Sequence, residues 1–224
     1  MKSVPDNFPV KDFRQKLISW WKHKGRNFPW RNSSNPYHIL IAEVLLHRTR
    51  ADQVVPVYLE FLKRFPSIEA IASVPHSEVK NMLYSLGLHW RAEFLYRMAT
   101  EITQRYGGHI PEQREKLEFL PGVSRYIASA VRCFAFGYPE VLPDTNTVRI
   151  TGRVFGIPIT DGSRRSKQFR ELLQFLLDPD YPREFNFALI DLGALICRPK
   201  HPFCHLCPVS NMCLYGRQEE RNHA

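Results

Sequence analysis

The feature that most restricts the fold is a group of four cysteines near the carboxyl end of the chain. They are Cys197, Cys204, Cys207 and Cys213, in the spacing C-x6-C-x2-C-x5-C. Four thiolates this close in sequence can surround one compact centre, whereas structural zinc sites more often use two separated pairs of cysteines. The amino-terminal residues carry no apolar run suited to a signal peptide, which makes a disulfide framework the poorer interpretation. We therefore expect a metal centre, with zinc as one alternative.

Apolar residues recur at helical spacing along almost the whole chain, and no segment alternates as a strand would. The fifth cysteine, Cys133, lies on one such apolar segment, and we interpret it as a core residue. The tail 217–224 is expected to fray. The sequence therefore predicts an all-α fold. Helices are expected over residues 13–25, 38–49, 54–65, 67–74, 76–87, 89–108, 114–120, 125–137, 145–156, 166–177 and 185–197.

The composition excludes several classes of protein. Hydrophobic residues make up 44% of the 224 residues, enough for one core or two small adjoining ones, and no apolar run is long enough to span a membrane. The chain carries 31 Lys and Arg against 22 Asp and Glu, a formal net charge of +9. This charge favours polyanions such as DNA or RNA, although many basic proteins bind no nucleic acid. We expect a soluble, intracellular monomer with no membrane association.

A tight connection, LPGVS (120–124), joins two helical patterns. Pro121 ends the first helix, and Gly122 supplies backbone angles that other residues reach only at a cost. The second helix then begins with free backbone N–H groups, which together with the helix dipole bind an anion such as a DNA phosphate. The alternative is an ordinary helical hairpin with no ligand. The candidate contacts are Gly122, Val123, Ser124 and Arg125.

The segments LPGVSRYIASAV (120–131) and VLPDTNTVRITGR (141–153) resemble the helix-hairpin-helix, the Gly/Pro-rich loop and the aspartate motif of DNA glycosylases of the endonuclease III and MutY superfamily. One departure is Ser124, where the family usually has a second glycine. The archaeal thymine-DNA mismatch glycosylases, which act on G·T and G·U pairs, are the branch that the chain resembles most. Further blocks resemble the family in its own order, from about Trp20 to Cys213: FPWR (28–31), NPYHILIAEVLLHRT (35–49), SLGLHWRA (85–92) and the cysteine loop.

The resemblance implies an iron–sulfur protein made of two helical lobes. It implies one [4Fe–4S] cluster held by the four cysteines of the loop 197–213. We expect a structural role for this centre, because all four ligands are protein thiolates and no position stays open. A central helical domain is expected over 28–138 and includes the helix-hairpin-helix. Residues 1–27 and 139–224 are expected to form the second helical lobe, which carries the cluster loop.

Asp144 opens the pattern Asp-Thr-Asn-Thr at a helix start, and an N-cap alone would explain it, since Asp is among the best capping residues. The resemblance places it at the position of the essential carboxylate. Such a carboxylate stabilises positive charge on the sugar, or helps to activate water, when the N-glycosidic bond breaks. The resemblance also puts the catalytic cleft between the lobes, with Tyr126 on one side and Asp144 on the other. The target nucleotide must be flipped out of the duplex to reach it.

Two further residues receive catalytic roles from the resemblance. Glu43 is the only acid in ILIAEVLLHR (39–48), and the residues alone favour a narrow solvent stripe of Glu43, His47 and Arg50. The resemblance instead assigns Glu43 to base recognition or to protonation of the leaving base. Tyr126 stands where bifunctional relatives carry a lysine that forms a Schiff base. A phenol cannot form that imine, so we expect water to be the nucleophile; packing of the hairpin is the alternative role of the ring.

Two short segments are candidates for further DNA contacts. His47 and Arg48 stand where MutY-like enzymes have two glutamines that wedge into the duplex and contact the orphaned partner base. Arg48 could fill the gap and donate hydrogen bonds to a guanine. The alternative is two solvated basic residues. Gly87, His89 and Arg91 lie at a loop-to-helix turn and are expected to form a second DNA contact.

Together these features predict a monofunctional DNA glycosylase, without lyase activity, that removes thymine or uracil mispaired with guanine in base-excision repair of deamination damage. Its expected partner is double-stranded DNA with a mismatched base, and its expected place is the cytoplasm, on the nucleoid. Tyr126 in place of the lysine, Arg48 in place of a glutamine, and a chain that ends soon after Cys213 favour this substrate over adenine. The alternatives are removal of adenine opposite guanine or oxidised guanine, and a non-catalytic DNA-binding module.

Overall fold

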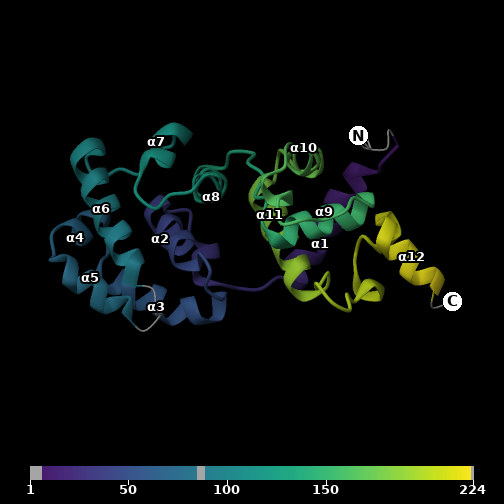
Figure 1. The fold of residues 1–224 in the computed structure, drawn as a ribbon, viewed down its shortest axis with the longest axis horizontal. Coiled ribbons are helices and arrows are strands. Elements are labelled where there is room, and N and C mark those ends of the chain that lie inside the picture. The colour runs from purple at the N-terminus through teal and green to yellow at the C-terminus, as the bar shows by residue number, and fades with distance from the viewer. Residues whose placement is uncertain (1–6, 85–88, 223–224) are drawn as a thin grey trace. The chain divides into compact units, whose positions relative to one another are not determined.

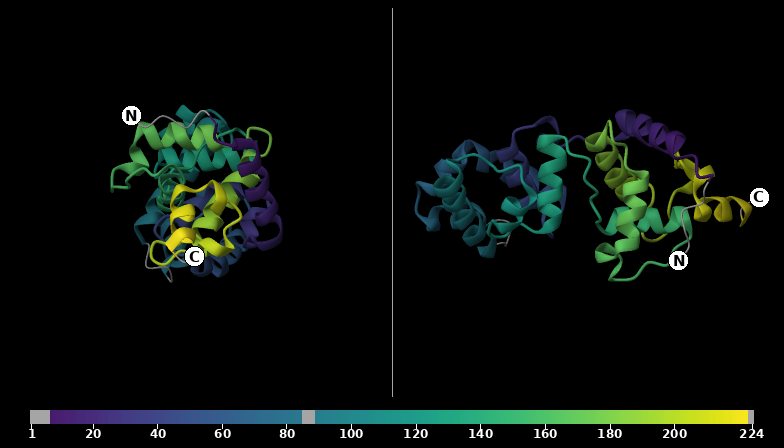
Figure 2. Two further views of the ribbon diagram at one scale, coloured as in Figure 1. Left: turned by 90° about the vertical axis from the view of Figure 1, so that its right-hand side faces the viewer. Right: turned by 90° about the horizontal axis from the view of Figure 1, so that it is seen from above.

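The computed structural model describes residues 7–84 and 89–222, and every regular element in these ranges is helical (Figures 1 and 2). The all-α prediction is therefore confirmed for the described part of the chain. None of the helices described there is long and apolar enough to cross a membrane. The first elements are α1 (Val10–Lys24), the 3-10 helix η1 (Pro29–Asn32), α2 (Pro36–Leu46), α3 (Ala51–Arg64), α4 (Ile68–Ala72), α5 (His76–Met82), α6 (His89–Tyr106), α7 (Arg114–Phe119) and α8 (Arg125–Phe136). The remaining elements are α9 (Thr145–Phe155), η3 (Ser163–Arg165), α10 (Lys167–Leu176), α11 (Pro182–Leu195), η4 (Cys204–Leu206), η5 (Ser210–Met212) and α12 (Leu214–Asn222).

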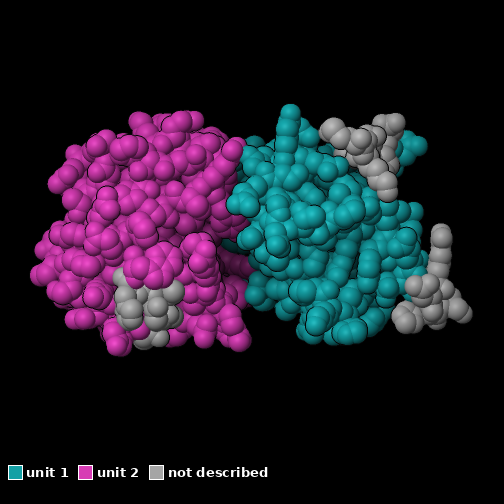
Figure 3. All heavy atoms as spheres, in the orientation of Figure 1, with its two compact units in different colours: residues 1–26, 139–224 teal, residues 27–138 magenta. Residues whose placement is uncertain are grey.

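The chain forms two compact units, which Figure 3 draws in different colours. Unit 2 is the continuous stretch Asn27–Tyr138. Unit 1 combines Met1–Arg26 with Pro139–Ala224. The chain therefore passes from one unit to the other twice, once after α1 and once after α8 (Figure 1).

Unit 2 is built around α2, in which every residue from Ile39 to Leu45 is buried. The side chain of Asn35 caps this helix by accepting a hydrogen bond from the backbone N–H of Tyr37 at 2.9 Å. In the same unit α2 packs against α3 and α8, and α6 packs against α4 and α5. The helix ends at Leu46, before the expected end at residue 49, so the segment that follows α2 is a tight loop.

Unit 1 is built around α9 and α11, which pack against each other. In addition α11 packs against α1, and α9 packs against α10 and α12. The two central helices approach closely at Gly193, where an added Cβ would lie 2.5 Å from the Cβ of Asn146. Only glycine fits such an approach without a shift of the neighbouring side chain. The expectation that the tail 217–224 frays is wrong for most of its length, since α12 continues to Asn222 and is stabilised by its contact with α9.

Cys133 lies on α8 with no exposed surface, as a core residue should. It belongs to unit 2, whereas the four clustered cysteines belong to unit 1. The core interpretation of this cysteine is therefore confirmed.

Candidate active site and nucleic-acid interface

The helix-hairpin-helix lies in unit 2, where a short turn joins α7 to α8. Gly122 has φ +77°, in the left-handed region, and an added Cβ would also lie 2.8 Å from the Cβ of Phe94. Glycine is therefore required here for two reasons, its backbone angle and the nearby ring. The turn closes with a hydrogen bond from the backbone N–H of Val123 to the carbonyl of Leu120 at 3.1 Å.

Ser124 begins α8 as its N-cap, and its hydroxyl accepts a hydrogen bond from the backbone N–H of Ile127 at 3.3 Å. Its φ is −77°, a value open to any residue, so this backbone does not need the second glycine that the family usually has. Gly122, Ser124 and Arg125 are exposed, whereas Val123 is buried beneath them. The start of α8 thus offers backbone donors and one cation to an anion in solvent.

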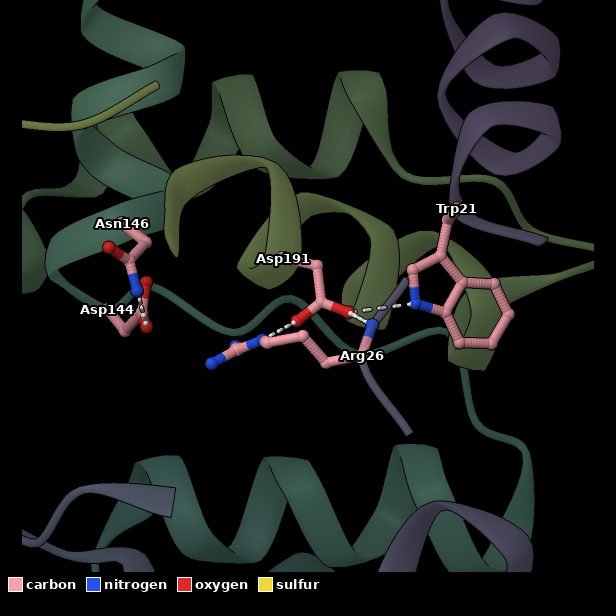
Figure 4. Close-up of polar contacts among 5 residues, drawn as sticks. All are labelled: Trp21, Arg26, Asp144, Asn146 and Asp191. Atoms are coloured by element: carbon pink, nitrogen blue, oxygen red, sulfur yellow. Dashed lines mark hydrogen bonds and ion pairs between the residues drawn. The ribbon is translucent and has the colours of Figure 1, made fainter. Parts of the chain in front are cut away.

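Asp144 is the N-cap of α9 in unit 1 and forms a reciprocal capping box with Thr147. Its Oδ1 accepts a hydrogen bond from the backbone N–H of Thr147 at 2.7 Å, and the Thr147 hydroxyl oxygen accepts one from the backbone N–H of Asp144 at 2.8 Å. Asn146 donates from its side-chain amide to Asp144 Oδ2 at 3.4 Å. Both carboxylate oxygens therefore have a donor, and Figure 4 shows the contact with Asn146.

The surroundings of Asp144 move its pKa in opposite directions. Burial raises the pKa of the carboxyl above its usual value, and this is the largest effect. The hydrogen bonds from Thr147 and Asn146 and the charge of Arg149 lower that pKa and offset part of the rise. The carboxyl is thus held in one orientation in a place where its charge is poorly solvated.

Arg149, one turn along α9, ties this helix start to the cysteine loop. Its guanidinium donates to Asn146 Oδ1 at 2.8 Å, to the carbonyl of Gly193 at 2.8 Å and to the carbonyl of Cys197 at 2.8 Å. One turn further, Arg153 donates to Cys197 Sγ at 3.2 Å. Two arginines of the helix that begins at Asp144 therefore fix the first cysteine of the group.

A second acid of unit 1, Asp191 on α11, is fully buried, and sequence reasoning did not single it out. It has no exposed surface, and it accepts hydrogen bonds from Arg26 Nε at 2.7 Å, from the Arg26 backbone N–H at 2.8 Å and from Trp21 Nε1 at 3.2 Å. Figure 4 shows the Arg26 side chain extending from Asp191 toward the side where Asp144 and Asn146 lie. The available signal was a lone acid in the apolar segment FNFALIDLGAL (185–195), the same kind of signal that singled out Glu43.

Glu43 lies on α2 and is only 8% exposed, so the solvent stripe that the residues alone favoured does not include it. Tyr126 lies in the first turn of α8 and is half-buried. Because α2 and α8 pack against each other, unit 2 brings the helices of these two residues together. Asp144 belongs to the other unit.

His47 and Arg48 follow α2 and are exposed. Arg48 has φ +62°, a left-handed conformation that is unfavourable for a residue with a side chain. Burial of part of the ring lowers the pKa of His47, and the charges of Arg91 and Arg48 lower it further. This loop therefore presents one permanent cation and an imidazole that favours its neutral form.

The second expected DNA contact is described only in part. Gly87 lies outside the described residues, and His89 begins α6 but its side chain lies outside the description. Arg91 is described and is only 1% exposed, which differs from the surface position that a phosphate contact suggests. Its guanidinium donates to the carbonyl of Leu45 at 2.6 Å.

The four cysteines of unit 1 are partly buried and form no disulfide. Burial is the largest cause that raises the pKa of Cys207 to about 12 and that of Cys213 to about 11; backbone hydrogen bonds offset part of the rise, and the neighbouring thiols of the group add to it. The thiols are thus close enough to repel one another as thiolates, and a cationic centre would relieve that repulsion. Nevertheless, no three His, Cys, Asp or Glu side chains within residues 7–84 and 90–219 are arranged to hold a single metal ion.

Comparison with known proteins places this fold in a class. The chain matches the model of the HhH-GPD superfamily of base excision DNA repair proteins over residues 41–175, more than half of its length. It belongs to that superfamily, and the family resemblance of the sequence is confirmed. Within the superfamily it is 42% identical to the thymine-DNA glycosylase of Aeropyrum pernix, over 94% of this chain and 96% of that protein. It is 38% identical to the thymine/uracil-DNA glycosylase of Pyrobaculum aerophilum, over 97% of each.

Solved structures agree with this assignment. The structure of a thermostable thymine-DNA glycosylase superimposes with a TM-score of 0.85 at 36% identity, covering 93% of this chain and 97% of that one. A trapped endonuclease III–DNA covalent intermediate superimposes with a TM-score of 0.81 at 23% identity, which supports the fold alone.

Proposed function

We propose that this protein is a DNA glycosylase of base-excision repair that removes thymine or uracil mispaired with guanine. The observation that carries the proposal is its similarity, over almost the whole of both chains, to glycosylases named for thymine or for thymine and uracil. Its substrate is double-stranded DNA with a mismatched base, which it binds as a monomer. A mispaired base costs less to extrude than a paired one, and this contributes to selectivity.

In this proposal Asp144 is the catalytic carboxylate. Hydrolysis of an N-glycosidic bond develops positive charge on the sugar, which a fixed carboxylate stabilises. The capping box and Asn146 supply the fixed orientation, so little reorganisation is needed when that charge develops. The carboxylate also helps to activate the attacking water.

Tyr126 and Glu43 act on the target nucleotide from unit 2. A phenol at position 126 forms no Schiff base, so the reaction stops at base release and leaves the strand intact. Glu43, buried on α2, recognises the base or protonates it as it leaves. Their helices pack together, which supports a shared role on one substrate.

The DNA is held by the hairpin and by the loop that follows α2. The backbone N–H groups at the exposed start of α8 and the side chain of Arg125 bind a phosphate. Arg48 fills the gap left by the extruded nucleotide and donates to the orphaned guanine, beside His47.

The four cysteines hold one [4Fe–4S] cluster with a structural role. Their partly buried, mutually repelling thiols favour a cationic centre, and their C-x6-C-x2-C-x5-C spacing, which differs from the separated pairs common in zinc sites, supports a cluster over zinc. When bound, the cluster supplies a fixed cross-link of the loop and no open coordination position. Iron and sulfide content with visible absorption in the purified protein tests this assignment, and a colourless protein that contains zinc contradicts it.

The deciding experiment is a base-release assay on oligonucleotides that carry T·G, U·G, A·G or adenine opposite oxidised guanine. We expect release of thymine and uracil, with no strand cleavage and no covalent complex after borohydride. The human adenine DNA glycosylase is 34% identical over 95% of this chain, so adenine release is the second candidate and the same assay detects it. Duplex binding without release of any base would support a DNA-binding module instead.

A further inference from the structure

Arg91, near the start of α6, is a fully buried arginine whose polar atoms are only partly satisfied. It is 1% exposed, and one nitrogen donates to the carbonyl of Leu45 at 2.6 Å. Its Nε and its other terminal nitrogen have no hydrogen-bond partner among the residues that the structure describes. Burial and the charge of Arg48 lower the pKa of the guanidinium to about 10, so it stays charged at neutral pH. A buried cation with two orphaned donors is costly, and stability alone would favour an apolar residue here.

The carbonyl of Leu45, which accepts this hydrogen bond, belongs to the last turn of α2. Carbonyls in that turn have no partner within the helix, and a cation at a helix carboxyl end is favourable. The segment that begins two residues after Leu45 is the loop of His47 and Arg48. Arg91 therefore holds the end of the helix from which the loop departs.

The neighbouring rings extend this contact into the loop itself. The Arg91 guanidinium lies 5.2 Å from the centre of the Trp90 ring, and the His47 ring meets Trp90 edge-on at 6.2 Å. Arg48 meanwhile has a left-handed backbone conformation, which is unfavourable for a residue with a side chain. Such a conformation persists only where the surrounding contacts determine it.

We propose that Arg91 is a positioning residue. It fixes the carboxyl end of α2 and so keeps the backbone of Arg48 in the conformation that lets its side chain occupy the gap in the duplex. The proposal rests on the proposed function of Arg48 and gives Arg91 an interior role in place of the expected surface contact. Arg91 does not touch the substrate. It acts only through the loop.

A double-variant cycle tests this role. Base release in single turnover is measured for the wild type, Arg91→Gln, Arg48→Ala and the double variant, on a T·G duplex and on uracil in single-stranded DNA. We expect Arg91→Gln to slow the duplex reaction about tenfold, as for the loss of a hydrogen bond to a charged group, and to leave the single-stranded reaction nearly unchanged. In the Arg48→Ala background, Arg91→Gln should slow base release by less than about twofold further, because the residue through which Arg91 acts is gone.

Two further variants separate positioning from stability. Arg91→Lys keeps a cationic donor for the Leu45 carbonyl and should recover part of the duplex rate. Arg97→Gln makes the same change at an exposed position of the same helix and should leave both rates unchanged. Equal losses of Arg91→Gln on both substrates, or losses that multiply fully in the double variant, would overturn the proposal and leave Arg91 as a core residue.

A second readout keeps the test independent of the substrate assignment. The fluorescence of 2-aminopurine beside the mispaired thymine reports extrusion of the base, whether or not that base is then released. If the wild type extrudes but releases neither thymine nor uracil, the proposed function fails while the same cycle in fluorescence still tests Arg91. Absence of extrusion by the wild type, or an Arg91→Gln signal equal to that of the wild type, contradicts the positioning role.

Discussion

The start of α9 in unit 1 and the loop after α2 in unit 2 differ in how fully their polar groups are hydrogen-bonded. At Asp144 each carboxylate oxygen has a donor and the backbone N–H is paired within the capping box. At the loop, Arg48 has a left-handed backbone, and Arg91 beneath it leaves two donors without a described partner. A group that stabilises developing charge gains from complete preorganisation, whereas a segment that must enter a duplex keeps capacity for new contacts.

Replacing the Asp144 carboxylate should have the largest effect among the changes that test this comparison. Asp144→Asn keeps a capping side chain of the same shape but removes the charge, so we expect base release to fall by about 10²-fold or more, with duplex binding nearly unchanged. Single-turnover release and a binding titration at fixed salt measure the two effects. Retained release would mean that the hydrogen bonds around Asp144 serve the helix alone.

Removing a cysteine distinguishes the two units in stability. Cys207→Ala should abolish the visible absorption of the centre and destabilise the protein by about 4 kcal/mol or more, since loss of a metal site is among the largest single-residue effects. Cys133→Ala, the matched change in unit 2, should keep the absorption and cost only the volume of a buried sulfur. Absorption spectra and thermal unfolding followed by circular dichroism provide the measurement.

Weakening the capping box tests how much its completeness contributes. Thr147→Val keeps the backbone donor to Asp144 Oδ1 but removes the hydroxyl that accepts from the Asp144 N–H and donates to the carbonyl of Leu142 at 2.7 Å. We expect a loss of about 1–2 kcal/mol in the free energy of unfolding and a smaller loss in the rate of base release. Urea unfolding gives the first value. A rate loss larger than that of Asp144→Asn would contradict the assignment of the charge as the main contributor.

The smallest effect expected is in the pH dependence of stability. The folded pKa of Asp144 is raised, so the folded state binds its proton more tightly than the unfolded state, and its contribution to stability falls as pH rises from the unfolded to the folded pKa. The free energy of unfolding of Asp144→Asn minus that of the wild type should therefore increase as pH rises through this window. The same difference should decrease again on acidification. Paired unfolding curves at several pH values measure it; a gap that moves the other way would show a lowered pKa.

Local patterns predicted much of the fold and part of the candidate site. Helical periodicity gave the all-α class, Gly122 marked a turn whose backbone requires glycine, and Asp144 was correctly expected to cap a helix. These features depend on neighbours in sequence, so one chain contains enough information to find them. The burial of Cys133 followed from the apolar helix around it.

Long-range contacts account for what the sequence did not indicate. Arg91 looks like a surface cation, but its carbonyl partner is Leu45, on a different helix. Arg26 and Trp21 meet Asp191 only after α1 packs against α11. The tail folds as α12 because α9 offers it a surface. None of these pairings leaves a periodic signal in the chain.

The hydrogen bonds from Arg26 to Asp191 have a consequence for folding during synthesis on the ribosome. Residues 27–138 form one uninterrupted unit, so this portion has all its own contacts available before residue 139 is added. Helix α1 is synthesised before this unit, whereas Asp191, the acid that binds Trp21 and Arg26, is synthesised after it. Helix α1 can therefore reach its native position against α11 only after the whole of unit 2 has been made.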